Sequence, residues 1–319
     1  MANVTVYCNL ASFSRKYEPI HGPLSLFVCL FGSVANLLNI CVLTSKEMRW
    51  PTNVILTGLA VADLLVMLEY LPFAIHRYII ADGEKYVESY SYGWAVFTLF
   101  HALFSQVFHF ISCCLTVILA VWRYAAITSP HKSRYWCDSR KTLYAVLTTY
   151  LVCPVICTPF FLSLRILTYN QTCDRHGKIL SKKDLETFTG VVTKRPIYVT
   201  DYVSEEYKYA SFWVYGVVIK LVPCILLTHI SRKLIAVLLE TKQRKKILLA
   251  SNIPLQEYET RAFYQKKVDN IRQADRTSNM LVAILLLFLI TEFPQAILGL
   301  LMATKGQQFE KECYRPLGE

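Results

Sequence analysis

Polar side chains recur along one face of an otherwise apolar stretch around residue 110. Ser105, His109, Ser112, Thr116 and Arg123 lie at offsets of 0, 4, 7, 11 and 18 residues, close to one side of a helix. At about 1.5 Å per residue this stripe is about 27 Å long, nearly the thickness of the hydrocarbon core of a bilayer. We therefore expect one helix to carry polar groups from one membrane surface to the other and to face neighbouring helices.

The same stripe has simpler interpretations. The hydroxyls of Ser112 and Thr116 can bond the carbonyl four residues back, and the sequence leaves this alternative open. For His109 we favour a hydrogen-bonded interior group over a metal ligand, because no partner stands at ligand spacing. The expectation is therefore a polar interior without a metal site.

Asp63 is a carboxylate in an apolar segment, Leu59-Ala60-Val61-Ala62-Asp63-Leu64. A carboxylate within the membrane needs a partner, an ion or a proton. We favour a polar site with Asn36 and Ser112 that could hold a sodium ion. The alternative is a neutral Asp63 that is satisfied inside the bundle.

Glu292 lies two residues before Pro294 in another apolar segment. Glu292, Gln295 and Gly299 are spaced i, i+3 and i+7, and Phe288 precedes them on the same face, so this face is predicted to point inward. Pro294 removes a backbone hydrogen bond and is a candidate hinge together with Phe288.

Glu69 is harder to place from the pattern. It lies 120° around the helix from Asp63, whereas Tyr70 shares the face of Asp63. Pro72 could rotate the following turn. The sequence gives equal weight to two positions for Glu69, one in a pocket of the bundle and one at the lipid headgroups.

The elements that position these residues are long apolar blocks. Of the 319 residues, 54% are hydrophobic, 13% aromatic and only 18% charged. Because about 20 apolar residues cross a bilayer as a helix, we predict an all-α membrane protein and exclude the soluble enzymes as a class. No nucleophile–base or metal constellation suggests an enzyme. The predicted spans are 23–45, 52–80, 93–123, 142–164, 208–235 and 275–304.

Orientation follows from charge and sequons. The first 22 residues have no apolar core typical of a signal peptide, and we expect them outside at the plasma membrane. The second inner loop is then strongly basic, and the sequons at Asn3 and Asn170 face outward as candidate glycosylation sites. We attribute the net charge of +11 to loops that face anionic lipid, not to nucleic-acid binding. Three cysteines face the oxidising side, Cys8, Cys173 and Cys313, and the sequence does not choose among their pairings.

Several motifs occur in the order of a known family. Five of the six predicted spans carry, in this order, Asn36, Leu59–Asp63, Trp122-Arg123-Tyr124, Pro223, and Phe288 with Pro294. The chain thereby resembles the rhodopsin-like G-protein-coupled receptors. Longer matches, such as Leu68-Glu69-Tyr70-Leu71-Pro72-Phe73 and Phe288-Leu289-Ile290-Thr291-Glu292-Phe293-Pro294-Gln295, resemble the invertebrate myosuppressin/FMRFamide-type neuropeptide receptors, especially those of nematodes.

The resemblance implies a secreted amidated peptide as ligand and a heterotrimeric G protein as partner. In such receptors the equivalents of Arg123, Tyr124 and Arg276 contact the G protein, and the equivalent of Asp63 belongs to an ion-sensitive network. The subfamily's ligands end in Arg-Phe-amide, so Glu292 is a candidate counter-ion for the arginine. The ligand-binding candidates are Glu69, Tyr70, Phe73, Ser105, Gln106, His109, Tyr215, Glu292, Phe293 and Gln295.

The chain also departs from the family pattern. Trp122 replaces the acidic residue before Arg123, and the usual cysteine at the outer end of the third span is absent. Cys8–Cys313 is one substitute disulfide, and Cys173 with either cysteine is another. We expect a rhodopsin-like helical bundle with six of the seven transmembrane helices, in which 305–319 is a truncated third outer loop.

The sequence allows three further interpretations. A product without the seventh span is expected to fold or signal poorly alone, as a truncated gene model or as an isoform that dimerises with a full-length receptor. A non-signalling fragment remains an alternative. A six-span transporter or channel is disfavoured because no repeat or filter motif is present.

Overall fold

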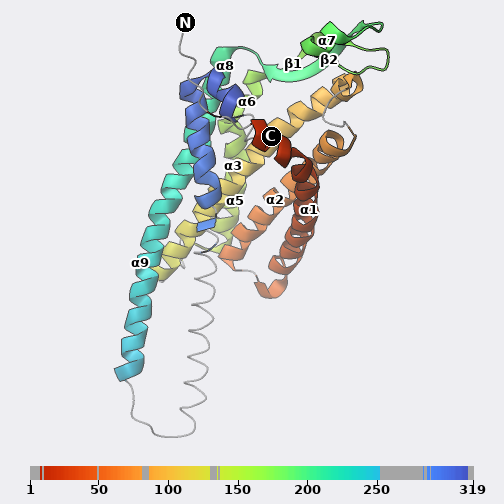
Figure 1. The fold of residues 1–319 in the computed structure, drawn as a ribbon. Coiled ribbons are helices and arrows are strands. Elements are labelled where there is room, and N and C mark those ends of the chain that lie inside the picture. The colour runs from red at the N-terminus through yellow and green to blue at the C-terminus, as the bar shows by residue number, and fades with distance from the viewer. Residues whose placement is uncertain are drawn as a thin grey trace.

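The computed structural model describes residues 8, 11–48, 50–80, 86–129, 135, 137–251, 283, 286–287 and 289–314. The long helices form an elongated bundle, and a β-hairpin lies across one end of it (Figure 1). The elements of the first half are α1 (Ala11–Leu43), η1 (Lys46–Met48), α2 (Pro51–Ile75), the π-helical turn η2 (His76–Ile80), η3 (Val87–Tyr90), α3 (Tyr92–Thr128), α5 (Ser139–Ile156) and α6 (Thr158–Ser163).

The second half begins with the hairpin and returns to the bundle. Its elements are β1 (Leu164–Cys173), α7 (Lys182–Thr187), β2 (Thr193–Tyr202), α8 (Glu205–Trp213), the π-helical η4 (Val214–Leu221), α9 (Val222–Ser251), a helix over 289–305, α11 (Gln307–Phe309) and η5 (Glu310–Tyr314).

Within the described residues, five helices are long and apolar enough to cross a membrane. They are Pro19–Leu43, Pro51–Ile80, Tyr92–Thr128, Ser139–Ser163 and Glu205–Glu240. These confirm the prediction of a helical membrane bundle. The predicted span 275–304 lies partly outside the described residues, and its described part, 289–305, is helical.

Two helices extend far beyond the predicted spans. α1 begins at Ala11, well before residue 23, and continues through Pro19 and Pro23. α9 continues to Ser251, beyond residue 235, and extends past the end of the bundle opposite the hairpin (Figure 1). Apolarity marks only the part of a helix suited to lipid, whereas the helix itself continues where the composition still favours it.

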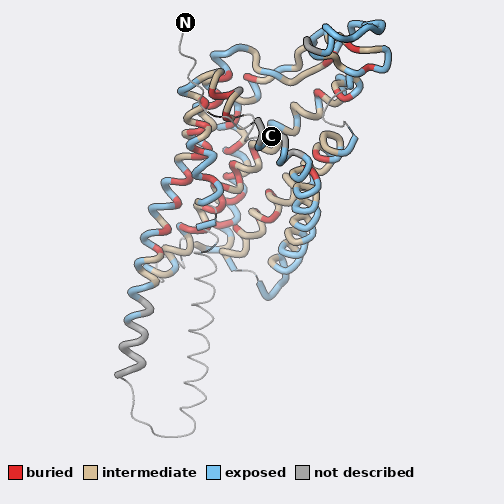
Figure 2. Tube along the Cα trace, in the orientation of Figure 1, coloured by how far each residue is buried: buried red, intermediate tan, exposed pale blue. Residues whose placement is uncertain are grey.

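The core is centred on α3. Ile111, Leu115 and Leu119 of α3 are almost fully buried, and α3 contacts α2, α5 and α9. By contrast, the apolar side chains of α1 remain largely exposed, because α1 packs mainly on α2 (Figure 2). An apolar exposed face is what a lipid environment favours.

Two hydrogen bonds tie α5 to its neighbours. The indole Nε1 of Trp122 donates to Thr142 Oγ1 at 3.0 Å, and the hydroxyl of Tyr150 donates to the carbonyl of Gly58 at 2.7 Å. Polar groups within a bilayer must find partners in the protein. Trp122, which replaces the family's acidic residue, therefore fixes α3 to α5 instead of pairing with the adjacent Arg123.

β1 and β2 form a hairpin in the long segment between the fourth and fifth predicted spans. The strands are antiparallel, with Thr168 opposite Tyr198. The hairpin docks on the start of α3, where Thr200 Oγ1 donates to the carbonyl of Ala95 at 3.1 Å and Tyr198 packs edge-on against Tyr92. We call this end of the bundle the hairpin end.

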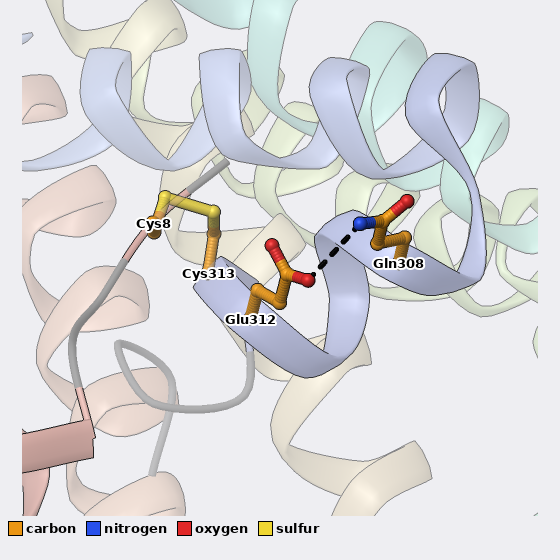
Figure 3. The surroundings of a disulfide bond; sticks show 4 residues. All are labelled: Cys8, Gln308, Glu312 and Cys313. Carbon is orange, nitrogen blue, oxygen red and sulfur yellow. Dashed lines mark hydrogen bonds between the residues drawn. A yellow bond between two sulfur atoms is a disulfide. The ribbon is translucent and has the colours of Figure 1, made fainter. Parts of the chain in front are cut away.

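A disulfide joins Cys8 to Cys313 at the hairpin end (Figure 3). The structure thus selects one of the pairings that the sequence left open, and Cys173 is a buried free thiol that contacts Thr193. The bond ties η5 to Cys8, which precedes α1 along the chain.

A buried ion pair supports the same region. Lys208 Nζ lies 2.5 Å from Glu310 Oε2, and both side chains are more than nine-tenths buried. Burial, with the nearby Tyr314 and Glu310, raises the pKa of Tyr202. Burial and Glu310 likewise raise the pKa of Tyr314. Both phenols are therefore neutral and pack as aromatic side chains beside the pair.

Two glycines allow η4 and the helix 289–305 to approach closely. A Cβ built on Gly216 would lie 3.1 Å from the backbone carbonyl carbon of Gly299 and 3.1 Å from the backbone nitrogen of Leu300. Small residues at such crossings allow helices to pack in membranes. This contact lies within one or two turns of Lys220 and Glu292.

Gly216→Ala should separate these two helices and lower the free energy of unfolding by about 1–3 kcal/mol, as overpacking does elsewhere. Gly93→Ala is the matched control, because a Cβ there meets nothing within 4 Å. The measurement is the thermal unfolding midpoint of the purified chain. Equal midpoints for the two variants would contradict the proposed close contact.

Candidate functional site

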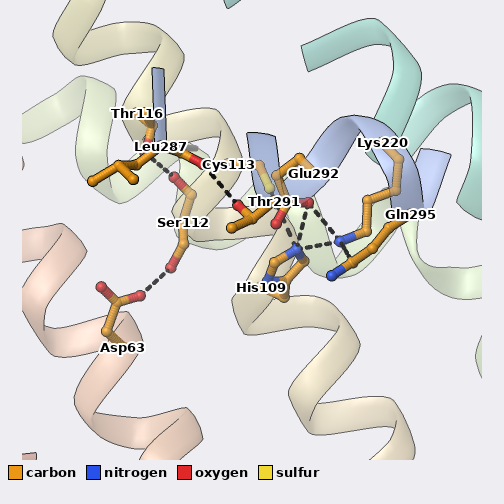
Figure 4. Close-up of polar contacts among 10 residues, drawn as sticks. All are labelled: Asp63, His109, Ser112, Cys113, Thr116, Lys220, Leu287, Thr291, Glu292 and Gln295. Carbon is orange, nitrogen blue, oxygen red and sulfur yellow. Dashed lines mark hydrogen bonds and ion pairs between the residues drawn. The ribbon is translucent and has the colours of Figure 1, made fainter. Parts of the chain in front are cut away.

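Three elements bring charged and polar side chains together inside the bundle. His109 comes from α3, Lys220 from η4, and Glu292 and Gln295 from the helix 289–305; we call these four residues the buried charge cluster (Figure 4). Lys220 is 2% exposed and Glu292 5% exposed. In the sequence Lys220 and Glu292 stand in different apolar segments, so only the fold shows that they meet.

The ammonium of Lys220 is the centre of the cluster. Its Nζ donates to Glu292 Oε2 at 2.6 Å and to Gln295 Oε1 at 2.8 Å, and it also contacts His109 Nε2. Nε2 of His109 lies 3.0 Å from the same Glu292 oxygen. The three donor positions of the ammonium are therefore matched by three partners.

Whether Nε2 of His109 carries a proton decides which of Lys220 and Glu292 it can hydrogen-bond. A bare Nε2 on His109 accepts a hydrogen bond from Lys220, whereas a protonated Nε2 donates to Glu292. Removing one member of such a buried pair leaves an uncompensated charge, which typically costs about 3–5 kcal/mol. The cluster is thus a specific tie between η4 and the helix 289–305, in which each member needs the others.

The local backbone explains how Lys220 reaches this position. η4 is a π-helical stretch. This form is rare in proteins, and where it occurs it is often at a functional site. The close contact of Gly216 with Gly299 then brings η4 next to the helix that carries Glu292. That helix continues through Pro294, whose missing N–H frees one backbone carbonyl.

The cluster borders a set of atoms with metal-ligand chemistry. Nε2 of His109, Sγ of Cys113 and a carboxylate oxygen of Glu292 all lie within 4.8 Å of one another. These are the ligand types of zinc. However, the ammonium of Lys220 already supplies a positive charge between His109 and Glu292. The geometry therefore fits an internal ion pair better than a divalent cation.

Asp63 lies at a separate position, on the side of α3 that faces α2. Ser112 Oγ donates to Asp63 Oδ1 at 2.8 Å (Figure 4). The hydroxyl of Thr116 instead donates to the carbonyl of Ser112, four residues back. The local backbone bond that the sequence left open for both residues is therefore found for Thr116, whereas Ser112 contacts another helix. The amide of Asn36, expected near Asp63, donates to the carbonyl of Gly32 and contacts the sulfur of Met67, one turn of α2 beyond Asp63.

Glu69 is turned inward. The residue is 9% exposed, and its Oε1 lies 2.7 Å from Nδ1 of His101 on α3. Its second oxygen, Oε2, is buried without a hydrogen-bond partner in the described part of the chain. Phe73 stacks on the His101 ring at a centroid distance of 4.0 Å, and Tyr70 lies 5.8 Å from it. The structure therefore places Glu69, Tyr70 and Phe73 together, at the hairpin half of α2.

The remaining ligand-binding candidates are distributed around these two groups. Tyr215 is half-buried, with its ring 5.5 Å from Lys220 Nζ, whereas Phe293 is 47% exposed. Ser105 and Gln106 are half-buried on α3, and the amide nitrogen of Gln106 is buried with no partner among the described residues.

At the opposite end, Arg123 and Tyr124 are half-buried, and Nε of Arg123 has no hydrogen-bond partner within the described ranges. Asn170 is exposed on β1. Arg276, Phe288 and Asn3 lie outside the described residues.

Two site residues were absent from the predicted set. His101 stands four residues before Ser105, so it extends the polar stripe of α3 by one turn, and this signal was present in the sequence. Lys220 is the single charged residue of segment 209–231, which marked it as costly but did not identify its partner.

Glu292→Lys should place two ammonium groups side by side and lower the free energy of unfolding by about 3–5 kcal/mol. Lys220→Glu should be similarly destabilising, because it brings two carboxylates together. The double variant restores one charge of each sign and should recover most of the loss. Thermal unfolding of the four proteins measures the coupling, and strictly additive losses would contradict a direct pair.

Comparison with known proteins identifies the family of this chain. A model of the family described as serpentine-type seven-transmembrane G-protein-coupled chemoreceptor Srw matches residues 23–313. The chain is 31% identical to the G-protein coupled receptor dmsr-1 of Caenorhabditis elegans, over 98% of this chain and 64% of that protein.

Two further relatives carry a ligand in their names. The sex peptide receptor of Drosophila melanogaster is 26% identical over 88% of this chain and 59% of that protein. The sex peptide receptor-related protein 2 of C. elegans is 29% identical over 92% and 61%. The chain therefore spans about three fifths of the length of these relatives. Because the family model covers most of a multi-pass helical bundle with a buried polar interior, this chain belongs to the serpentine-type Srw family of seven-transmembrane G-protein-coupled receptors.

Proposed function

We propose that this protein is a plasma-membrane receptor that binds a secreted amidated peptide, of the FMRFamide/myosuppressin-like class, at the hairpin end. It then activates a heterotrimeric G protein through the opposite end. The observation that carries the proposal is the similarity along 98% of the chain to a G-protein coupled receptor. The name of the Drosophila relative supports a peptide as the ligand, and the motifs around Glu69 and Glu292 support the narrower class.

The orientation is argued from two features at the hairpin end. The Asn170 sequon is exposed on β1, and the Cys8–Cys313 disulfide lies at the same end. Glycosylation and stable disulfides both belong to the outer, oxidising side of the membrane. At the other end α9 carries the run Lys242-Gln243-Arg244-Lys245-Lys246, as expected for a cytoplasmic segment.

In this receptor the buried charge cluster acts as an internal tie. Lys220 and His109 both contact Oε2 of Glu292, so the charge of this carboxylate is already paired and a ligand arginine would compete with Lys220 for it. We therefore assign to the cluster the transmission of binding to the hinge at Pro294, two residues away. A rearrangement of the pair would shift η4 against the helix 289–305 and so move the G-protein end.

Arg123→Ala should abolish peptide-evoked G-protein activation and change peptide binding by less than about threefold, because Arg123 lies at the end of α3 far from the hairpin. The measurements are peptide binding and nucleotide exchange on the G protein, with Phe-Met-Arg-Phe-amide as the probe.

Arg140→Ala is the matched control, since Arg140 is an exposed arginine at the same end of the bundle, on α5. It should retain nucleotide exchange. Full exchange in Arg123→Ala would contradict the coupling role, and no response of the unmodified protein to any amidated peptide would contradict the receptor function itself.

A further inference from the structure

We propose that the carboxylate of Glu69, and not that of Glu292, receives the cationic side chain of the peptide, with a preference for the guanidinium of arginine. The inference rests on the proposed function, since it identifies the cation subsite of that receptor. It reverses the assignment favoured by the sequence, in which Glu292 was the counter-ion.

The first step is the contrast between the two buried carboxylates. Oε2 of Glu292 has Lys220 at 2.6 Å and His109 at 3.0 Å. Glu69 has one partner, His101 on Oε1, and no cation of lysine or arginine is paired with it among the described residues. Glu292 is therefore already neutralised by the protein, whereas Glu69 retains capacity for a charged donor.

The second step is the unsatisfied oxygen. Oε2 of Glu69 is buried and lacks a hydrogen-bond partner in the ranges that the structure describes, and the side chain is only 6% exposed. A buried acceptor without a donor is costly. A guanidinium presents parallel N–H donors that match the two oxygens of a carboxylate. One of these donors would satisfy Oε2, and the other would share Oε1 with His101.

The third step is the aromatic surroundings. Phe73 lies on the His101 ring, and Trp94 stacks on Phe73 at 6.2 Å. Planar guanidinium groups stack on aromatic faces, and arginine is less strongly hydrated than lysine. The same rings offer an apolar surface to an aromatic residue next to the arginine. The group therefore combines the two chemistries of an Arg-Phe-amide terminus.

The fourth step is access. Glu69 lies six residues beyond Asp63 along α2, about 9 Å closer to the hairpin end at the rise of a helix. The side chain of His101 is 15% exposed and that of Glu69 only 6%, so a ligand would meet the imidazole before the carboxylate. A ligand entering from the hairpin end reaches Glu69 before the deeper charge cluster.

The test varies the receptor and the peptide together. Glu69→Gln keeps the shape of the side chain and removes its charge. The probes are Phe-Met-Arg-Phe-amide and the same peptide with citrulline, a neutral isostere, in place of arginine. The unmodified receptor should lose about 10–100-fold in potency on the citrulline exchange, the range for a hydrogen bond to a charged group. Glu69→Gln should respond to the two peptides equally.

Glu292→Gln is the matched control, because it neutralises the other carboxylate. Whatever its effect on total activity, its arginine-to-citrulline ratio should equal that of the unmodified receptor. Retention of the full ratio in Glu69→Gln, or its loss only in Glu292→Gln, would overturn the assignment. No response of the unmodified receptor to either peptide would instead count against the proposed function.

A second measurement does not depend on a variant. The terminal phenylalanine of the probe is replaced by benzoylphenylalanine, and the bound peptide is cross-linked to the unmodified receptor by light. Label on the fragments that hold Phe73 and Trp94 supports the subsite. Label confined to the fragment around Phe293 contradicts it.

Discussion

The arrangement of the bundle depends on how ionised groups are kept inside an apolar environment. A single charge in the hydrocarbon region is costly, so each one requires a partner from another helix. Lys220 and Glu292 meet this requirement for η4 and the helix 289–305. The pair converts two unfavourable residues into a directional link that fixes how these helices face each other.

The backbone must accommodate that link. Gly216 and Gly299 remove the side chains that would otherwise keep the two helices apart, and the π-helical turn sets the direction of Lys220. α3 passes between the two polar regions, with Ser112 toward Asp63 and His109 toward the cluster (Figure 4). One helix therefore contacts both polar regions, which suits a protein that transmits a conformational change from one end of the bundle to the other.

Much of the architecture could be predicted from the sequence, because apolar length alone identifies membrane helices. The inward polar face of α3 also followed from helical spacing. Ser112 was expected near Asp63, and the structure shows their hydrogen bond. The pairing of Lys220 with Glu292 could not be predicted, since the two residues are 72 positions apart and no periodicity links them. Glu69 was ambiguous for the same reason: its position depends on His101 in another helix. For Asn36, expected near Asp63, the structure shows its amide bonded within α1 and to Met67, one turn of α2 beyond Asp63.

The disulfide between Cys8 and Cys313 has a consequence for the covalent structure of the chain. Its cysteines are 305 residues apart in sequence, so the backbone between them forms a closed ring. In the chain-entropy description such a ring restricts the unfolded state by about 5–6 kcal/mol. A protease that cuts one loop of this ring opens it but releases no fragment, and both halves of the bundle stay joined until the disulfide is reduced.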